Sequence, residues 1–228
     1  MRIAELYQSV QGEGLLTGAP SVFVRASGCN LRCSFCDTPY TSWAPEGDDW
    51  SVAEIVSRTL ELGVQHVVIT GGEPMLFAEL VPLCDELRAA GRHITIETAG
   101  TLFLDLACDL MSISPKRANS TPPVDRAGSW TARHERTRHQ PAVIRRLVAR
   151  YAYQFKFVID RHEDLADLDD YLREFPEIDR DRVLLMPQGT DLATLQATAR
   201  WLEPYCAEHA LRYCPRKHVE WYGFQRGT

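Results

Sequence analysis

The chain has 228 residues, 45% of them hydrophobic, which suits one globular domain with an apolar core. Its 31 acidic and 25 basic side chains leave a mild net charge of −6, which argues against a broad electrostatic surface for DNA or RNA. No apolar run is long enough to span a bilayer, and residues 1–27 lack the pattern of a secretion signal. We therefore expect a cytoplasmic enzyme of one domain, residues 1–228, that acts on a small molecule and binds neither nucleic acid nor membrane.

The N-terminal residues predict two strands joined by a glycine-containing turn. Ile3–Tyr7 is the first strand, and Pro20–Ser27, rich in β-branched and aromatic residues, is a core strand. Between them, residues 9–14 read Ser-Val-Gln-Gly-Glu-Gly, and the two glycines permit a tight turn close to a ligand. On its own this motif fits a surface turn with a solvated glutamate better than a ligand site. Arg25, near the end of the second strand, is either a rim residue or a partner for a carboxylate.

Three cysteines follow in one loop, Cys29, Cys33 and Cys36, within the sequence Gly-Cys-Asn-Leu-Arg-Cys-Ser-Phe-Cys-Asp-Thr. They are too close together for an ordinary disulfide framework, and such clusters in cytosolic enzymes are more often metal-binding or catalytic. Structural zinc needs four ligands, and no further cysteine or histidine pair completes that set. A [4Fe–4S] cluster usually takes four thiolates, so three would leave one iron open to a small molecule. A zinc or redox cluster with an unseen fourth ligand is the alternative.

From residue 51 the chain alternates helices and strands. Ser51 and Glu54 have the spacing of a capping box, which begins a helix that ends near Leu62. The strand His66–Thr70 runs into Gly-Gly-Glu-Pro, residues 71–74, where paired glycines let the polar end of a ligand approach the backbone. The remaining expected strands are 93–97, 109–114, 153–159, 182–186 and 211–213, and the remaining helices are 77–90, 142–150, 162–175 and 192–209.

Residues 117–140 interrupt this alternation. The segment has Pro122, Pro123 and Gly128 early, followed by several arginines and histidines. We expect a mobile, loop-rich, basic insertion and favour a solvated surface over a binding patch as its role. No motif indicates what it does.

The alternation predicts an α/β fold built from right-handed βαβ units with parallel strands. About six or seven units are too few for a complete eight-stranded barrel, so we expect an incomplete (β/α) TIM-like barrel with its ligand at the carboxyl ends of the strands. The candidate site residues fall at or just beyond those ends, which supports a single active site. They are Arg25, Cys29, Thr70, Gly72, Glu97, Ser114–Lys116 and Met186–Gln188.

The CxxxCxxC spacing resembles the signature of the radical S-adenosylmethionine (SAM) superfamily. With Val-Gln-Gly-Glu-Gly, Thr-Gly-Gly-Glu-Pro, Ile-Glu-Thr-Ala-Gly-Thr and Ser-Pro-Lys, the sequence resembles the 7-carboxy-7-deazaguanine synthase family. The resemblance implies a radical SAM core with a [4Fe–4S] cluster, SAM and Mg²⁺. Family members contract 6-carboxy-5,6,7,8-tetrahydropterin to 7-carboxy-7-deazaguanine with loss of ammonia, a step toward queuosine.

The resemblance also implies a mechanism. SAM occupies the open iron, and an electron from an external donor such as flavodoxin splits its sulfonium C–S bond to give a 5′-deoxyadenosyl radical. That radical abstracts hydrogen from the pterin ring carbon bearing the carboxylate, the ring contracts, and a hydrogen returns so that SAM is reused. A homodimer is the family expectation.

The resemblance assigns roles to individual positions. The cluster would be held by Cys29, Cys33 and Cys36, and Mg²⁺ by the hydroxyl of Thr38. Arg25 would bind the substrate carboxylate, while Glu13 and Glu97 would act at the amino-pyrimidine N–H groups. The full substrate set is Val10, Gln11, Gly12, Glu13, Arg25, Thr70 and Glu97. The SAM set is Phe35, Cys36, Asp37, Gly72, Ser114, Pro115, Lys116, Met186, Pro187, Gln188 and Gly189.

Two other functions use the same cysteine loop. A radical SAM activase, which installs a glycyl radical on a partner protein, would need a groove for a partner loop in place of a pterin pocket. An iron–sulfur electron carrier would not need Gly71–Pro74 or the series of βα units. The C-terminal residues 215–227 resemble the family's tail in type, but we assign them no role, and His218 fits a structural role better than a catalytic one.

Overall fold

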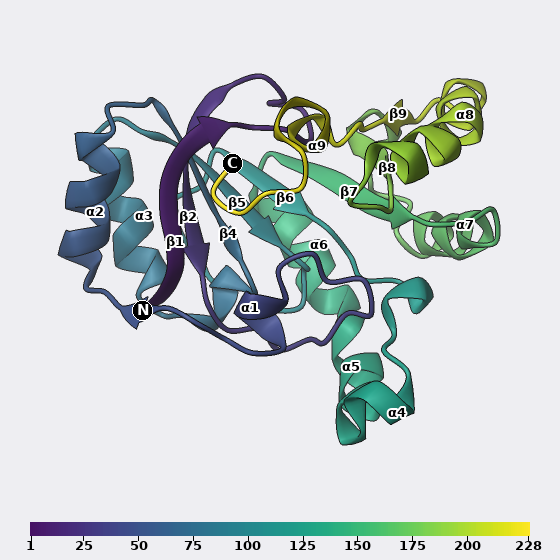
Figure 1. Ribbon diagram of the computed structural model, residues 1–228, viewed down its shortest axis with the longest axis horizontal. Helices are drawn as coiled ribbons and strands as arrows, with labels where there is room; N and C mark the ends of the chain where they lie inside the picture. The colour runs from purple at the N-terminus through teal and green to yellow at the C-terminus, as the bar shows by residue number, and fades with distance from the viewer.

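The computed structural model describes residues 1–228 and contains one nine-stranded sheet in the order β3-β1-β2-β4-β5-β6-β7-β8-β9. The edge strands β3 and β9 do not pair with each other, so the sheet is an open, incomplete barrel, as predicted. Figure 1 shows the curved sheet with α3 and α6 behind it and the C-terminal segment crossing in front. The strands are β1 (Arg2–Val10), β2 (Pro20–Ala26), β3 (Asp48–Asp49), β4 (His66–Gly71), β5 (His93–Thr98), β6 (Leu110–Ile113), β7 (Tyr153–Ile159), β8 (Val183–Pro187) and β9 (Arg212–Tyr213).

The sheet is parallel from β2 through β4 to β9, but the N-terminal strand corrects the expectation of a parallel sheet throughout. β1 pairs antiparallel with β2, and β3 pairs antiparallel with β1. The reason is the connection, because residues 11–19 are too few for the crossover that parallel neighbours require. β1 also extends beyond the predicted Ile3–Tyr7 to Val10. This extension places the Gln11–Gly14 turn directly at the end of a strand.

The predicted helices between the strands are present. The capping box at α2 (Val52–Glu61) is formed as expected: Ser51 Oγ accepts from the Glu54 N–H at 3.2 Å, and Glu54 Oε2 accepts from the Ser51 N–H at 2.8 Å. No helix combines the length and apolarity needed to cross a bilayer. The other helices here are α1 (Pro39–Ser42), η1 (Pro74–Leu76), α3 (Leu80–Ala89), α6 (Pro141–Arg150), α7 (Asp164–Glu174), η3 (Arg180–Arg182), α8 (Leu192–Glu208) and α9 (Lys217–Tyr222).

The core lies between the parallel strands and the helices that cover them. Residues of β4, β7 and β8 are buried along almost the whole strand, as expected where both faces of a parallel sheet are covered. Phe155 and Phe157 on β7 stack with their ring centroids 5.8 Å apart, and Tyr171 of α7 packs edge-on against both. The rigid interior therefore fixes where the carboxyl ends of the strands lie.

Residues 117–140 are helical, so the prediction of a loop-rich segment was wrong. They form η2 (Ala118–Ser120), α4 (Val124–Ala127) and α5 (Ser129–Arg138). Pro123 sits at the N-cap of α4, and Gly128 has a φ of +56° between α4 and α5, so the residues that suggested a loop mark helix boundaries. Because α5 is polar on nearly every side, its sequence shows none of the apolar periodicity by which a helix is predicted.

Leu83 on α3 tests whether the helix layer stabilises the sheet. Its side chain is fully buried in the main core, so Leu83→Ala is expected to lower the free energy of unfolding by about 2–5 kcal/mol. The same change at Leu192, 43% exposed on α8, should cost less than about 0.5 kcal/mol. Urea denaturation of the two variants measures the free energy of unfolding of each. If Leu83→Ala and Leu192→Ala lower it equally, the described core does not stabilise the fold.

Candidate active site

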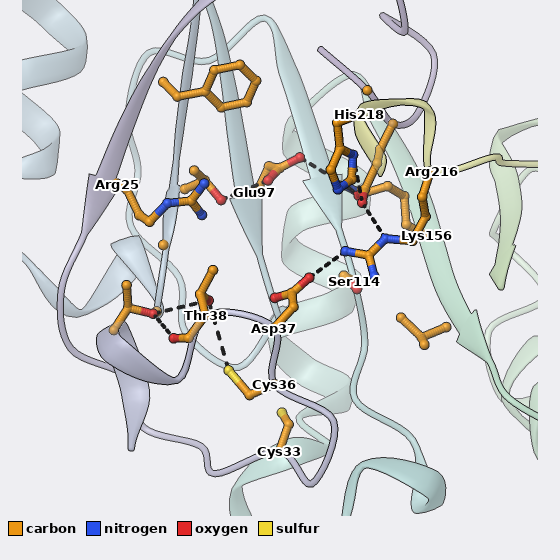
Figure 2. A pocket seen from close by; sticks show the side chains of 18 of the residues that line it. Arg25, Cys33, Cys36, Asp37, Thr38, Glu97, Ser114, Lys156, Arg216 and His218 are labelled. Carbon is orange, nitrogen blue, oxygen red and sulfur yellow. Dashed lines mark hydrogen bonds and ion pairs between the residues drawn. The ribbon is translucent and has the colours of Figure 1, made fainter. Parts of the chain in front are cut away.

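One cavity of about 310 Å³ lies at the carboxyl ends of the parallel strands. In Figure 2 the cysteines lie at one end of it, and Glu97, Lys156, Arg216 and His218 lie at the other. Nearly all the predicted site residues line it: Val10, Gln11, Gly12, Glu13, Arg25, Cys29, Cys33, Phe35, Cys36, Asp37, Thr38, Thr70, Gly72, Glu97, Ser114, Lys116, Met186, Pro187 and Gln188.

Two residues expected to contact SAM do not line the cavity, and their contact with SAM stays a prediction. Pro115 is buried between two lining residues, Ser114 and Lys116. Gly189 directs its carbonyl oxygen to the guanidinium of Arg216, which donates to it at 2.6 Å. Both residues shape the chain next to the cavity without forming its wall.

The cysteine loop joins β2 to α1 without regular secondary structure. Leu31, Cys33 and Ala99 form a small buried cluster against which Cys29 and Cys36 pack. Burial raises the pKa of the Cys29 and Cys33 thiols to about 12. Cys36 Sγ lies 3.2 Å from the hydroxyl of Ser42. The three cysteines therefore pack on one small cluster and line the same part of the cavity wall.

The donor set of this corner fits an iron–sulfur cluster better than a single metal ion. No three His, Cys, Asp or Glu side chains converge closely enough to share one ion, which counts against the zinc alternative. The cysteines of a cluster instead bind different iron atoms, so their sulfur atoms need not meet at one point. Three thiols on one wall of a cavity with open space beside them meet that requirement.

The Gly-Gly-Glu-Pro segment ends β4 and packs on the cysteine loop. The Glu73 N–H donates to the Gly28 carbonyl at 2.9 Å, and the Gly72 N–H donates to the Ala26 carbonyl at 3.0 Å. A Cβ on Gly72 would lie 2.0 Å from the Gly28 oxygen, so only glycine allows this approach. The two motifs that the sequence presented separately are one packed unit.

Glu73 is a structural residue of this unit. Its carboxylate is fully buried and accepts from the Thr98 hydroxyl, the Ala99 N–H and the Met75 N–H at 2.9–3.1 Å. Burial raises the pKa of Glu73, and these hydrogen bonds oppose that effect. Glu73 does not line the cavity; it ties the end of β4 to the end of β5.

The opposite end of the cavity is organised by Lys156, which projects from the middle of β7. Its Nζ lies 2.9 Å from a carboxylate oxygen of Glu13 and 2.9 Å from one of Glu97, and its side chain is 5% exposed. Glu97 also accepts from the Thr70 hydroxyl at 2.8 Å. Burial alone would raise the pKa of Glu13, but the charges of Lys156 and Arg216 outweigh burial and hold that pKa well below its usual range.

Arg216 connects the two ends of the cavity. Its guanidinium donates to Glu13 at 3.1 Å and to Asp37 at 2.6 Å, and its side chain is 7% exposed. Asp37 directly follows Cys36 in the cysteine loop. His218 Nδ1 lies 3.9 Å from Glu13, in the same group. One arginine thus positions a carboxylate beside the cysteines and a carboxylate beside Lys156.

Arg25 lies in the cavity but already has partners. Its Nε donates to Glu5 at 2.7 Å and one terminal nitrogen donates to the Tyr7 hydroxyl at 2.9 Å. Glu5 also accepts from Tyr40 at 3.0 Å and from Arg226 in the C-terminal segment at 2.6 Å. The other terminal nitrogen of Arg25 makes no hydrogen bond within the chain and is available for a carboxylate.

Sequence reasoning missed Lys156 and Arg216. A lysine inside the mostly apolar strand Tyr153–Ile159 was a signal that went unused, because buried lysines are rare without a partner. Arg216 gave no comparable signal. The C-terminal residues 224–228 also line the cavity, which their sequence does not indicate.

Comparison with known proteins agrees with this geometry. The family model described as the Radical SAM superfamily matches residues 23–136. The 7-carboxy-7-deazaguanine synthase of Rhodopirellula baltica is 45% identical over 227 residues, covering 99% of this chain and 88% of that protein. The synthase of Halobacterium salinarum is 44% identical and covers 95% of this chain and 88% of that protein.

A solved structure shares the architecture along almost the full length. QueE from Escherichia coli superposes with a TM-score of 0.71 at 26% identity, covering 95% of this chain and 94% of that chain. The resemblance thus extends beyond the cysteine loop to the whole sheet and its helices. On these grounds the chain belongs to the 7-carboxy-7-deazaguanine synthase family of the radical SAM superfamily.

Proposed function

We propose that this chain converts 6-carboxy-5,6,7,8-tetrahydropterin into 7-carboxy-7-deazaguanine with loss of ammonia. The observation that carries this proposal is a single cavity with three thiols at one end and a lysine between two carboxylates at the other. Near-full-length relatives with this activity in their names support it. Because these names describe a synthase, they favour this activity over the glycyl-radical activase.

The cysteine end is suited to the cofactors of the superfamily. Cys29, Cys33 and Cys36 would hold a [4Fe–4S] cluster, which together with SAM would supply the 5′-deoxyadenosyl radical that starts the reaction. The SAM contacts proposed from Phe35, Asp37, Gly72, Ser114 and Lys116 are supported by the position of these residues on the cavity wall. Cys33 is buried and Cys29 and Cys36 are half-buried, which partly shields this end of the cavity from water.

The polar end is suited to the pterin. Lys156 keeps Glu13 ionised, so this carboxylate can accept hydrogen bonds from the amino-pyrimidine N–H groups, and Glu97 beside it can do the same. The free nitrogen of Arg25 is proposed to bind the substrate carboxylate. Gln11 is buried at the turn, where its side-chain oxygen accepts from the Glu13 N–H at 3.1 Å and holds the turn in place.

Mg²⁺ is a further part of the proposal. Thr38 lines the cavity two residues after Cys36, with its hydroxyl 3.9 Å from that sulfur and 3.3 Å from the Thr41 hydroxyl. An oxygen donor between the thiols and the open cavity suits a hard cation that also keeps water or substrate oxygens as ligands. The cation would help position the substrate carboxylate.

The electron donor and the assembly also remain proposals. An external one-electron reductant such as flavodoxin and a homodimer both follow from the family resemblance, and a cytoplasmic location stays a prediction from the sequence.

The activity is tested by incubating the reconstituted protein with SAM, dithionite and the carboxy-tetrahydropterin without oxygen and measuring products by mass. We expect 7-carboxy-7-deazaguanine, and Cys33→Ser should abolish it. Cys206→Ser, at a buried cysteine of α8 far from the loop in sequence, is the matched control and should retain activity. Cleavage of SAM without formation of the deazapurine would refute the proposed substrate but leave the radical SAM chemistry intact.

Lys156→Met keeps the length of the side chain and removes its charge. Because Glu97 then loses its cation and Glu13 keeps only Arg216, kcat/KM for the pterin should fall at least about 100-fold, while SAM binding is retained. Loss of Lys156 leaves Arg216 to oppose burial alone, so the pKa of Glu13 rises from its lowered value and the residual activity should be lost at a higher pH on the acid side of the profile. Lys217→Met, the same change at a more exposed site on α9, is the control. An unchanged acid limb would contradict the role given to Lys156.

Thr38→Ala tests the magnesium assignment. The concentration of Mg²⁺ that gives half-maximal activity should rise at least about tenfold. Removing a group that supports a metal site typically lowers metal affinity by that factor. Thr38→Ser keeps the hydroxyl and should restore the original Mg²⁺ response. If alanine and serine variants respond to Mg²⁺ like the unmodified protein, Thr38 is not a ligand.

A further inference from the structure

The helical segment 117–140, for which the proposed function provides no role, packs directly on the cysteine loop. Figure 1 shows α4 and α5 projecting from the sheet near the dark blue loop that leads into α1. The contacts concentrate on two residues of that loop, Arg32 and Ser34, which lie on either side of Cys33. The segment therefore holds the backbone next to the central cysteine of the motif.

Arg32 is held through its backbone by a histidine. The Arg32 N–H donates to Nδ1 of His134 on α5 at 3.2 Å, and His134 has no exposed surface. Nε2 of the same ring lies 3.0 Å from the Ser120 hydroxyl, which donates to the Arg117 carbonyl at 2.7 Å. Nδ1 accepts a hydrogen bond and therefore carries no proton, while Nε2 donates to the Ser120 hydroxyl. The ring is therefore neutral, with its proton on Nε2. Burial lowers the pKa of His134 to about 4, which keeps the ring neutral at ordinary pH.

The side chain of Arg32 meets the same helix. Its guanidinium lies over the Trp130 ring, 3.9 Å from the centroid, and donates to the carbonyls of Cys29 and Leu31 at 2.9 and 2.7 Å. α5 thus fixes both the peptide N–H and the side chain of Arg32. Because the Arg32 guanidinium donates to the Cys29 carbonyl, α5 also orients the peptide of Cys29 through Arg32.

The other side of Cys33 is held by η2 and α4. The Ser34 N–H donates to the Ser120 carbonyl at 2.9 Å, and the Ser34 carbonyl accepts from Arg126 at 2.8 Å. Arg126 also lies over the ring of Trp43, whose Nε1 donates to the Cys33 carbonyl at 3.1 Å. Since the cysteine loop has no helix or strand of its own, these contacts supply the hydrogen bonds that regular structure would otherwise provide.

We propose that the segment 117–140 is a clamp that holds the CxxxCxxC loop in its cluster-binding conformation, with His134 as the positioning residue. The clamp orders the loop before the cluster binds, so less conformational entropy is lost when the three thiolates engage iron. His134 acts through Arg32 and touches no cysteine in the described contacts. The proposal depends on the cluster and not on the pterin reaction, so it stands or falls independently of the substrate.

The test measures how firmly the protein keeps its iron. Anaerobically reconstituted protein is mixed with excess EDTA in the absence of pterin, and loss of the visible absorbance of the cluster is followed over time. His134→Ala should release iron about tenfold faster, the typical effect of removing a residue that orients a metal ligand. Arg136→Ala, at an exposed residue two positions along the same helix, is the matched control and should release iron at the original rate.

A conservative variant separates positioning from general stability. His134→Asn places an amide oxygen near the position of Nδ1, so it should recover much of the iron retention, although both variants lower the unfolding temperature of the cluster-free protein. Trp130→Ala removes the other contact of α5 with Arg32 and should also release iron faster, so the test does not depend on the folding of His134→Ala. Release rates for Ala, Asn and Trp130→Ala that equal that of Arg136→Ala would overturn the proposal.

Discussion

The site depends on a buried cation between two carboxylates. Lys156 lies within 2.9 Å of both Glu13 and Glu97, and Arg216 extends the charge network from Glu13 to Asp37. Taking these charges out of water is costly, and a well-packed apolar group would often stabilise a fold as well or better. Buried charges arranged along one wall of a cavity are therefore better explained by ligand binding than by stability.

This network also determines how distant parts of the chain assemble. Glu13 belongs to the turn after β1, Lys156 to β7, Asp37 to the cysteine loop and Arg216 to the segment before α9. The contact between Lys156 and Glu13 joins residues 143 positions apart, and that between Arg216 and Asp37 joins residues 179 positions apart. The cysteine end and the Lys156 end of the cavity are thereby held in a fixed relation, as the proposed hydrogen transfer between cofactor and substrate requires.

Local patterns in the sequence predicted the incomplete barrel and the part of the cavity wall at the strand ends, and the family resemblance predicted the rest of the wall, such as Glu13 and Thr38. Parallel strands show as short apolar runs, and residues just after them, such as Thr70 and Gly72, meet at one edge. Lys156 and Arg216 depend instead on partners brought close only by folding. The helices of 117–140 were missed because α5 is polar and has no apolar stripe. This helix contacts the cysteine loop mainly through a hydrogen bond from Arg32 to His134 and through the Arg32 guanidinium over the Trp130 ring, and such contacts need no apolar stripe.

The central claim is that cluster-bound SAM and the pterin share one cavity, close enough for direct hydrogen transfer. The most direct measurement uses pterin substrate carrying deuterium at the ring carbon that bears the carboxylate, with SAM and reductant under anaerobic turnover. Mass analysis should find deuterium in 5′-deoxyadenosine and in re-formed SAM. Formation of 7-carboxy-7-deazaguanine with no deuterium in either adenosyl compound would contradict the claim.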